Sequence, residues 1–342
     1  YGEMGSAGTR RAGSIDAMDE RSRVHGAWLV AMLMAMSAAC ASAAERGFAD
    51  PVLGAWDITV AHPDGAYPSW LEVRLRTEGE LMARFVGRFG SVRYLSSIRF
   101  GDGKLEFTAP AQYEAHDLHF VGTPAGNTIE GRTIDADGKA VRFTAIRSPM
   151  LVREAAATTG DTIDLFDGES LAGWKTRFDR HPGCWQVTDG LLTATPPCVD
   201  LITDSAFDDF RLEVEFRYPG GSNSGIYLRG RYEIQVQDDH GKALDPLRMG
   251  SVYGFVAPTI DASRAAGEWQ TYVISLIGRT VTVELNGATI IDGQRIPGIT
   301  GGALDSDQGS AGPIMLQGDH GPIEFRRITL TPLLISAATL NR

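Results

Sequence analysis

Residues 210–218 read FRLEVEFRY, and apolar and charged side chains alternate along them. A period of two is the pattern of a β-strand that turns one face to a hydrophobic core. The same alternation runs through 280–285, and Asn286-Gly287 separates that segment from a further apolar segment, 288–291. An Asn-Gly pair between two such segments is a strong signal for a tight β-hairpin. This part of the chain is therefore predicted to form long antiparallel strands.

More strand-like segments flank this hairpin, and none of them alternates with a helical pattern. They are 224–228, 231–236, 270–276 and 323–331. Long alternating strands without intervening helices are typical of two sheets packed face to face. We therefore expect a jelly-roll β-sandwich over residues 161–335.

The first half of the chain shows a shorter rhythm of the same kind. Residues 50–150 contain about eight brief alternating runs separated by turn pairs such as Asp64-Gly65 and Asp137-Gly138. This pattern predicts a small antiparallel β barrel or sandwich, and it contains no catalytic constellation. Residues 151–160 form a predicted linker of small polar residues, so the second domain is expected to fold alone. The predicted fold class is all-β throughout.

Length and charge limit the classes of partner. The 342 residues are enough for two domains, and 43 acidic residues outnumber 32 basic ones. An acidic chain without a basic run argues against nucleic acid and against an anionic membrane surface as partners. A neutral sugar would be indifferent to this charge.

Residues 1–44 are predicted to be a targeting segment. A short apolar run, 27–39, follows two arginines and precedes small residues that suit a signal peptidase. The run is too short to span a bilayer, so no membrane span is expected. The expected location is periplasmic or secreted. Lipid anchoring at Cys40 is an alternative, and the residues before Arg21 suggest an over-extended start.

Two cysteines remain after the targeting segment. In an oxidising compartment, Cys184 and Cys198 are expected to form a disulfide. Two buried free thiols are the alternative.

Several phrases in the second half resemble the 3-keto-disaccharide hydrolase family, and they occur in the family's order. They are Leu165-Phe166-Asp167-Gly168, Trp185-Gln186-Val187, Asn223-Ser224-Gly225-Ile226-Tyr227-Leu228-Arg229, Tyr232-Glu233-Ile234-Gln235-Val236-Gln237-Asp238, Gly267-Glu268-Trp269 and Gln317-Gly318-Asp319-His320-Gly321. The resemblance covers about 161–334. It implies a sandwich like that of the concanavalin A-like lectins and glucanases, and an enzyme that cleaves glycosidic bonds.

The implied substrate is a 3-keto-glucoside or 3-keto-disaccharide. Its ketone acidifies the hydrogen on C2, so a base can remove that proton and the C1 substituent can then leave by elimination, before water adds. Such a site needs a base and a group that stabilises the enolate oxygen. The implied partners are a small carbohydrate and, upstream, a separate sugar 3-oxidoreductase.

Three residues are the catalytic candidates. His320 is the preferred base because its ordinary pKa lies near neutrality, and a packed or solvated loop histidine is the alternative. The adjacent Asp319 either orients the ring or is only a polar turn residue, and the turn residue is the favoured interpretation. Arg229 is the candidate for the enolate oxygen, with a structural salt bridge as the alternative. Glu233 is the third, because Glu233, Gln235 and Gln237 alternate on one face of a strand and suggest a wet cleft, with an exposed edge strand as the alternative.

Substrate contacts are expected from a set of polar and aromatic side chains: Asn223, Gln235, Gln237, Asp238, Tyr253, Trp269 and Gln317. Bonding to its own turn backbone is the alternative for Asn223, and core packing is the alternative for Tyr253 and Trp269. No cofactor is indicated with certainty. A divalent metal at Asp238, Asp239 and His240 stays an alternative to an acidic surface turn.

Two other functions stay open. A conventional glycoside hydrolase would pair carboxylates such as Glu213 with Glu215 or Glu233 across a cleft. A carbohydrate-binding module without turnover would show an aromatic platform and no buried histidine.

Overall fold

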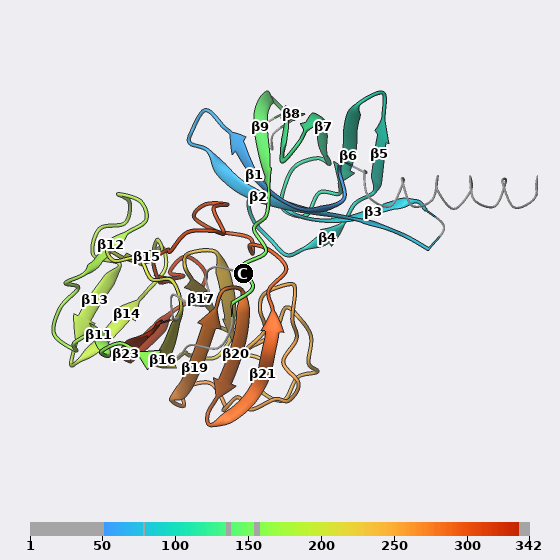
Figure 1. The fold of residues 1–342 in the computed structure, drawn as a ribbon. Helices are drawn as coiled ribbons and strands as arrows, with labels where there is room; N and C mark the ends of the chain where they lie inside the picture. The colour runs from blue at the N-terminus through green and yellow to red at the C-terminus, as the bar shows by residue number, and fades with distance from the viewer. Residues whose placement is uncertain (1–50, 78, 135–137, 154–157, 335–342) are drawn as a thin grey trace, which may run out of the picture. The chain divides into compact units, whose positions relative to one another are not determined.

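The computed structural model describes residues 51–334 except 78, 135–137 and 154–157. Every helix or strand element in these residues is a strand, as the alternating sequence predicts (Figure 1). The all-β fold class is confirmed. The predicted targeting segment and four residues of the predicted linker lie outside the described part. No helix in the described part has the length and apolar character needed to cross a membrane.

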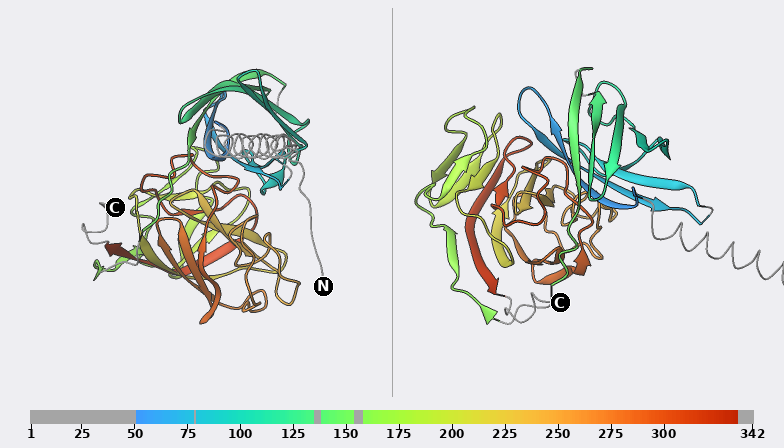
Figure 2. Two further views of the ribbon diagram at one scale, coloured as in Figure 1. Left: turned by 45° about the vertical axis from the view of Figure 1, so that its right-hand side comes forward. Right: turned by 45° about the horizontal axis from the view of Figure 1, so that its top comes forward.

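The first sheet is antiparallel and runs in the order β4-β3-β2-β1-β9-β8-β7-β6-β5. Its strands are β1 (Gly54–Ala61), β2 (Tyr67–Leu75), β3 (Leu81–Val86), β4 (Arg93–Tyr94), β5 (Ser97–Gly101), β6 (Lys104–Ala109), β7 (Leu118–Ala125), β8 (Thr128–Ile134) and β9 (Ala140–Arg147). The two edge strands are joined by Leu95 and Ser96, whose N–H groups donate to Ala83 of β3 and Thr108 of β6. The sheet therefore curls toward closure, as Figure 2 shows.

Two further sheets follow in residues 158–334, which we call the second domain, and the sheet of residues 54–147 is called the first domain. Both domains lie within one compact unit that begins at Val52. The larger of the two further sheets has the order β13-β14-β23-β16-β19-β20-β21, with β10 and β11 also paired to β23, and the smaller has the order β12-β15-β22-β17-β18. The larger sheet contains β10 (Thr158–Thr159), β11 (Ile163–Phe166), β13 (Trp185–Thr188), β14 (Leu191–Ala194), β16 (Phe210–Arg217), β19 (Gln270–Ile277), β20 (Thr280–Leu285), β21 (Ala288–Arg295) and β23 (Ile323–Leu334). The smaller contains β12 (Trp174–Thr176), β15 (Leu201–Thr203), β17 (Asn223–Leu228), β18 (Tyr232–Gln237) and β22 (Met315–Leu316).

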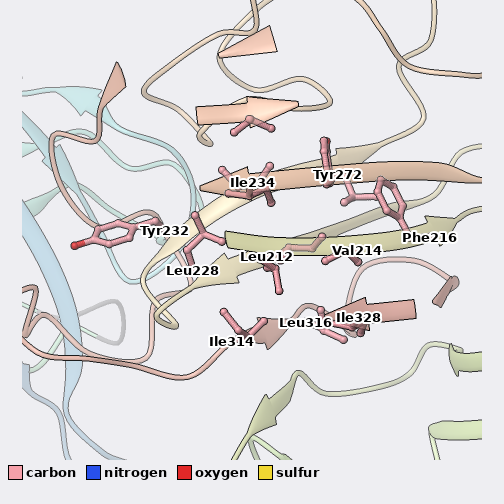
Figure 3. Packing of buried hydrophobic residues seen from close by; sticks show 14 of the residues in the cluster. Leu212, Val214, Phe216, Leu228, Tyr232, Ile234, Tyr272, Ile314, Leu316 and Ile328 are labelled. Atoms are coloured by element: carbon pink, nitrogen blue, oxygen red, sulfur yellow. The ribbon is translucent and has the colours of Figure 1, made fainter. Parts of the chain in front are cut away.

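The alternating positions of β16 form the centre of the sandwich core. Leu212, Val214 and Phe216 are fully buried, whereas the charged residues between them are only partly covered. They belong to one cluster with Leu228 and Ile234 of the smaller sheet (Figure 3). The alternation in the sequence therefore correctly predicts which face of β16 is buried, because the apolar face of each sheet packs against the other sheet and is removed from water.

The first domain contributes to the second domain's core. Trp70 of β2 and Val86 of β3 are fully buried in the sandwich cluster. A Cβ on Gly298 would lie 2.3 Å from the Trp70 indole, so only glycine permits this approach. Asp57 of β1 also accepts a hydrogen bond from the fully buried Gln308. A fragment that begins at Asp161 would expose this surface, and that such a fragment folds alone stays a prediction.

Cys184 and Cys198 form a disulfide with their Cα atoms 5.3 Å apart, which confirms the predicted pairing. Next to it, the Trp185 indole N–H donates to the Val199 carbonyl at 2.7 Å. The disulfide therefore fastens the segment that leads into Asp200.

Candidate active site

A cavity of about 320 Å³ opens on the smaller sheet of the sandwich. Its floor comes from β17 and β18, and its rim comes from the segment after β22 and from two loops of the first domain. The lining residues are Phe89, Gly90, Tyr113, Arg177, Asp200, Asn223, Tyr227, Glu233, Gln235, Tyr253, Gly301, Gly302, Gln317, Asp319 and His320.

Glu233 lies at the floor and is 3% exposed. It is paired across the β17–β18 ladder with Tyr227, whose hydroxyl lies 3.0 Å from Oε2 of Glu233 and 2.9 Å from the Gly301 carbonyl. A Cβ at Gly225 would lie 2.4 Å from Oε1 of Glu233, so the glycine of the Asn-Ser-Gly-Ile phrase makes room for this carboxyl.

Burial raises the pKa of Glu233 to about 8. The Tyr227 hydrogen bond and the nearby His320 lower it, but they do not offset the loss of hydration. The carboxyl group is therefore mainly protonated at neutral pH. A neutral carboxyl can donate a hydrogen bond to an oxygen that gains negative charge.

His320 and Asp319 lie at the rim with about half of each side chain exposed. Nδ1 of His320 lies 2.5 Å from Oδ1 of Asp319. This hydrogen bond raises the pKa of His320, and the same contact lowers the pKa of Asp319. With Nδ1 donating to the carboxylate, Nε2 carries the lone pair of the neutral ring. Of the two expectations for Asp319, the contact matches orientation of the ring rather than the polar turn residue that the sequence favours.

Arg177 and Asp200 form a second charged pair in the cavity wall. Nη1 of Arg177 lies 3.0 Å from Oδ2 of Asp200 and 2.8 Å from the Gly302 carbonyl. Burial raises the pKa of Asp200, opposed by the contact with Arg177. This arginine is the cation that the structure brings to the cavity, and the sequence reasoning did not select it.

Three of the predicted amide side chains line the cavity: Asn223, Gln235 and Gln317. Among the described residues, Oε1 of Gln317 is buried and has no hydrogen-bond partner. A buried acceptor without a partner is costly unless a ligand or water completes it. Tyr253 lines the cavity as well, and its N–H donates to the Glu233 carbonyl.

Arg229 is not brought to this cavity. Its side chain is 0% exposed, and its guanidinium contacts the Asp208 carbonyl at 2.7 Å and the Asp209 carboxylate at 2.8 Å. The backbone of Arg229 has φ +52°, so the strand alternation of β17 ends before it. The structural salt bridge, given as the alternative, is the arrangement found, and an enolate-binding role for Arg229 has no geometric support.

The remaining predicted contacts also lie off the cavity lining. Gln237 contacts Gln235 at 3.4 Å, and Asp238 accepts the N–H of Gly221 at 2.8 Å. The guanidinium groups of Arg217 and Arg326 lie 4.8 Å and 4.4 Å from the centre of the Trp269 ring. Alternation correctly predicts that Glu233 and Gln235 share a face, but it does not say where the cavity ends.

The alternative metal cluster is also occupied by protein partners. Asp239 is buried and pairs with Lys242 and Arg248 at 2.9 and 2.8 Å, while His240 faces Asp261. Among the described residues, no group of three or more His, Cys, Asp or Glu side chains is arranged to hold a metal ion.

Eight lining residues escaped the sequence reasoning: Phe89, Gly90, Tyr113, Arg177, Asp200, Tyr227, Gly301 and Gly302. Tyr227 had a usable signal, because it lies in the phrase that precedes the Glu233 strand. The others come from five loops, and no spacing in the sequence connects these loops.

Comparison with known proteins assigns residues 161–331 to a family. A model described as the 3-keto-alpha-glucoside-1,2-lyase-like domain matches residues 161–331. This match covers half of the chain, which therefore belongs to that family.

Individual relatives match more partially. A 3-keto-disaccharide hydrolase of Bacteroides thetaiotaomicron is 30% identical over 95 residues, which are 25% of this chain and 33% of the relative. The chain thus spans about a third of the length of that curated relative. Two solved structures from Parabacteroides distasonis, both described as proposed glycosyl hydrolases, are 33% and 27% identical. The first structure has a TM-score of 0.44, and the match covers 50% of this chain and 83% of that chain. The second structure has a TM-score of 0.40, and the match covers 51% of this chain and 100% of that chain.

Proposed function

We propose that this chain cleaves the glycosidic bond of 3-keto-glucosides or 3-keto-disaccharides by elimination followed by hydration. One observation carries the proposal. A buried carboxyl group with a pKa near 8, that of Glu233, shares a cavity with the Asp319-supported His320. A protonated carboxyl group beside a histidine that can accept a proton suits proton removal next to a ketone. Membership of the 3-keto-alpha-glucoside-1,2-lyase-like family supports the same substrate class.

His320 acts as the base in this proposal. Nε2 removes the C2 proton, and the C–H electron pair forms an enolate whose negative charge rests on the C3 oxygen. When the ketone re-forms, a C1–C2 double bond is made, the C1–O bond breaks, and the leaving oxygen takes the proton that His320 has removed from C2. Water then adds at C1 while C2 regains a proton. Such a positioned base contributes about 10²–10⁴-fold in rate.

Glu233 takes the role first expected of Arg229. As a neutral acid at the cavity floor, it donates a hydrogen bond to the C3 oxygen as the enolate forms. Gln317, Asn223 and Gln235 are suited to the hydroxyl groups of the same sugar ring, because their amides line the cavity around this floor.

A conventional glycoside hydrolase is the second candidate, and one observation favours it. Asp200 and Glu233 line the same cavity, and their charges influence one another. Such an enzyme needs two carboxyl groups on opposite sides of C1. The pairing of Glu213 with Glu215 is excluded from this role, since both lie on β16 and contact arginines of β23 outside the cavity.

The deciding experiment incubates the protein with 3-keto-trehalose and with unoxidised trehalose in parallel and follows released glucose. We expect glucose only from the ketone. Equal cleavage of trehalose would establish the conventional hydrolase instead. Binding of both sugars without cleavage would establish a carbohydrate-binding module. The Glu233→Gln variant is the control for contaminating glycosidases.

Two further elements of the proposal concern context. A separate sugar 3-oxidoreductase would have to supply the ketone, because the proposed steps neither oxidise nor reduce the sugar overall. Action in the periplasm or outside the cell agrees with the Cys184–Cys198 disulfide, since disulfides persist in oxidising compartments. Cell fractionation with an antibody to the chain tests this location.

A further inference from the structure

Two exposed aromatic side chains of the first domain line the cavity. Phe89 is 51% exposed and lies in the loop between β3 and β4, and Tyr113 is 70% exposed and lies in the loop between β6 and β7. Exposed aromatic residues are common singly, but two that converge on one polar cavity from separate loops indicate a binding surface. The proposed reaction at the floor assigns no role to either residue.

The two loops are fastened to each other. Arg93 donates to Gln112 at 3.0 Å and to Glu114 at 2.8 Å, and Gln112 donates to Ser91 at 2.9 Å. The other carboxylate oxygen of Glu114 accepts the N–H groups of Gln112 and Tyr113. These bonds hold the backbone at Tyr113 in one conformation. Such preorganisation reduces the entropy lost on binding.

The loop that carries Phe89 is also held against Gly301 and Gly302, which line the cavity. The N–H of Gly302 donates to the Arg88 carbonyl at 2.9 Å, and a Cβ on Gly301 would lie 2.1 Å from the Gly90 carbonyl oxygen. The Arg88 guanidinium lies 5.2 Å from the centre of the Phe89 ring. Gly301 and Gly302 therefore permit close contact with the backbone of the loop that carries Phe89. The same Gly301 accepts a hydrogen bond from Tyr227, the partner of Glu233.

Exposure divides the cavity into a floor and a mouth. The floor residues Tyr227, Glu233 and Gln235 are buried and polar, whereas Phe89 and Tyr113 are exposed and aromatic. The volume of about 320 Å³ lies at the lower end for ligand pockets, which run from roughly 300 Å³ upward. The floor therefore suits the keto ring, and the group that departs from C1 faces the mouth.

We infer that Phe89 and Tyr113 form the leaving-group subsite, where they bind a ring by its apolar face. This inference rests on the proposed function. The ring is a second pyranose or an aryl group, because both present a flat apolar surface to an aromatic side chain. The first domain thus determines which glycosides are accepted, while the sandwich performs the chemistry.

The test compares three substrates that share the 3-keto-glucosyl part and differ in the leaving group: methyl, phenyl and glucosyl. Phe89→Ala and Tyr113→Ala should each lower kcat/KM about 3- to 10-fold for a ring-bearing substrate, mainly through KM. The methyl substrate should change by less than about twofold, on the same basis. The larger loss, with phenyl or with glucosyl, identifies the natural ring.

Tyr94→Ala is the matched control, because Tyr94 is 64% exposed in the same domain and does not line the cavity. It should leave all three substrates unchanged. Phe89→Leu keeps the apolar volume but removes the flat face, so it should behave as Phe89→Ala does. Thermal melting establishes that each variant folds.

Equal losses on methyl and ring-bearing substrates would overturn the subsite, and so would no loss on any. If the wild-type protein cleaves none of the three, the proposed function fails separately. The subsite is then tested by saturation-transfer NMR with phenyl and methyl glucoside. Transfer to the phenyl ring that is lost in Phe89→Ala supports it, and equal transfer in both proteins overturns it.

Discussion

Arg177 and Arg229 each pair with a buried aspartate in the sandwich, yet only Arg177 reaches the cavity. Arg177 contacts Asp200 and the carbonyls beside the rim, and part of its side chain stays open to the cavity. Arg229 is entirely buried, and its contacts with Asp208 and Asp209 are all to protein.

The difference between these arginines is one of surroundings rather than of residue type. Arg229 belongs to a phrase typical of the family, and Arg177 lies in a loop without a recognisable phrase. A family phrase therefore indicates where a side chain matters, but it does not say whether that side chain lines the cavity, and Arg229 does not. The predictions below test this separation between cavity and core.

The largest effect is expected at the cavity. His320→Ala should lower kcat on a 3-keto-disaccharide about 10²–10⁴-fold, because the base is lost. The melting temperature should stay near that of the wild type, since the side chain is half exposed and packs against little. Turnover and thermal melting are measured on the same preparation. A fully active, normally folded variant would remove His320 from the mechanism.

At the core, Arg229→Met should lower the free energy of unfolding by about 3–5 kcal/mol, because it breaks a buried ion pair and leaves Arg153 as the remaining arginine partner of Asp209. Activity per folded molecule should not change. Arg177→Met is the matched variant and should show the reverse, with reduced activity and a smaller loss of stability. Urea unfolding and turnover distinguish them, and identical behaviour of the two variants would contradict the comparison.

The disulfide should contribute less than the buried pair. Replacing Cys184 and Cys198 by Ser opens a loop with a sequence separation of 14, so the free energy of unfolding should fall by about 3 kcal/mol. Denaturant titration measures the change. Two alkylatable thiols in unreduced wild-type protein, found by mass spectrometry, would show that the bond does not form.

The smallest effect is in the pH profile of kcat/KM. Activity should rise as His320 loses its proton, above its ordinary pKa of 6.5, and should fall as Glu233 ionises near pH 8. Between pH 7 and pH 9 the protonated fraction of Glu233 falls about tenfold. Asp319→Asn should move the acidic limb to lower pH, because the hydrogen bond that raises the His320 pKa is weakened. An acidic limb that stays in place would exclude this support.

The sequence by itself determines the strands and part of the floor. The alternation in 210–217 depends only on which side chains avoid water, so it correctly predicts β16 and the sandwich around it. Alternation also puts Glu233 and Gln235 on one face, since neighbouring side chains in a strand point to opposite sides. These are local rules that a single sequence states directly.

Only the tertiary structure decides the rest of the site. Arg177, Asp200, Phe89 and Tyr113 come from four separate loops, and their meeting depends on sheet order and on glycines that permit close approach. Arg229 leaves the expected face because its positive φ ends the alternation that would have predicted its direction. The alternation of apolar and polar residues predicts to which face of a strand a side chain points. Long-range packing determines which loops complete the cavity.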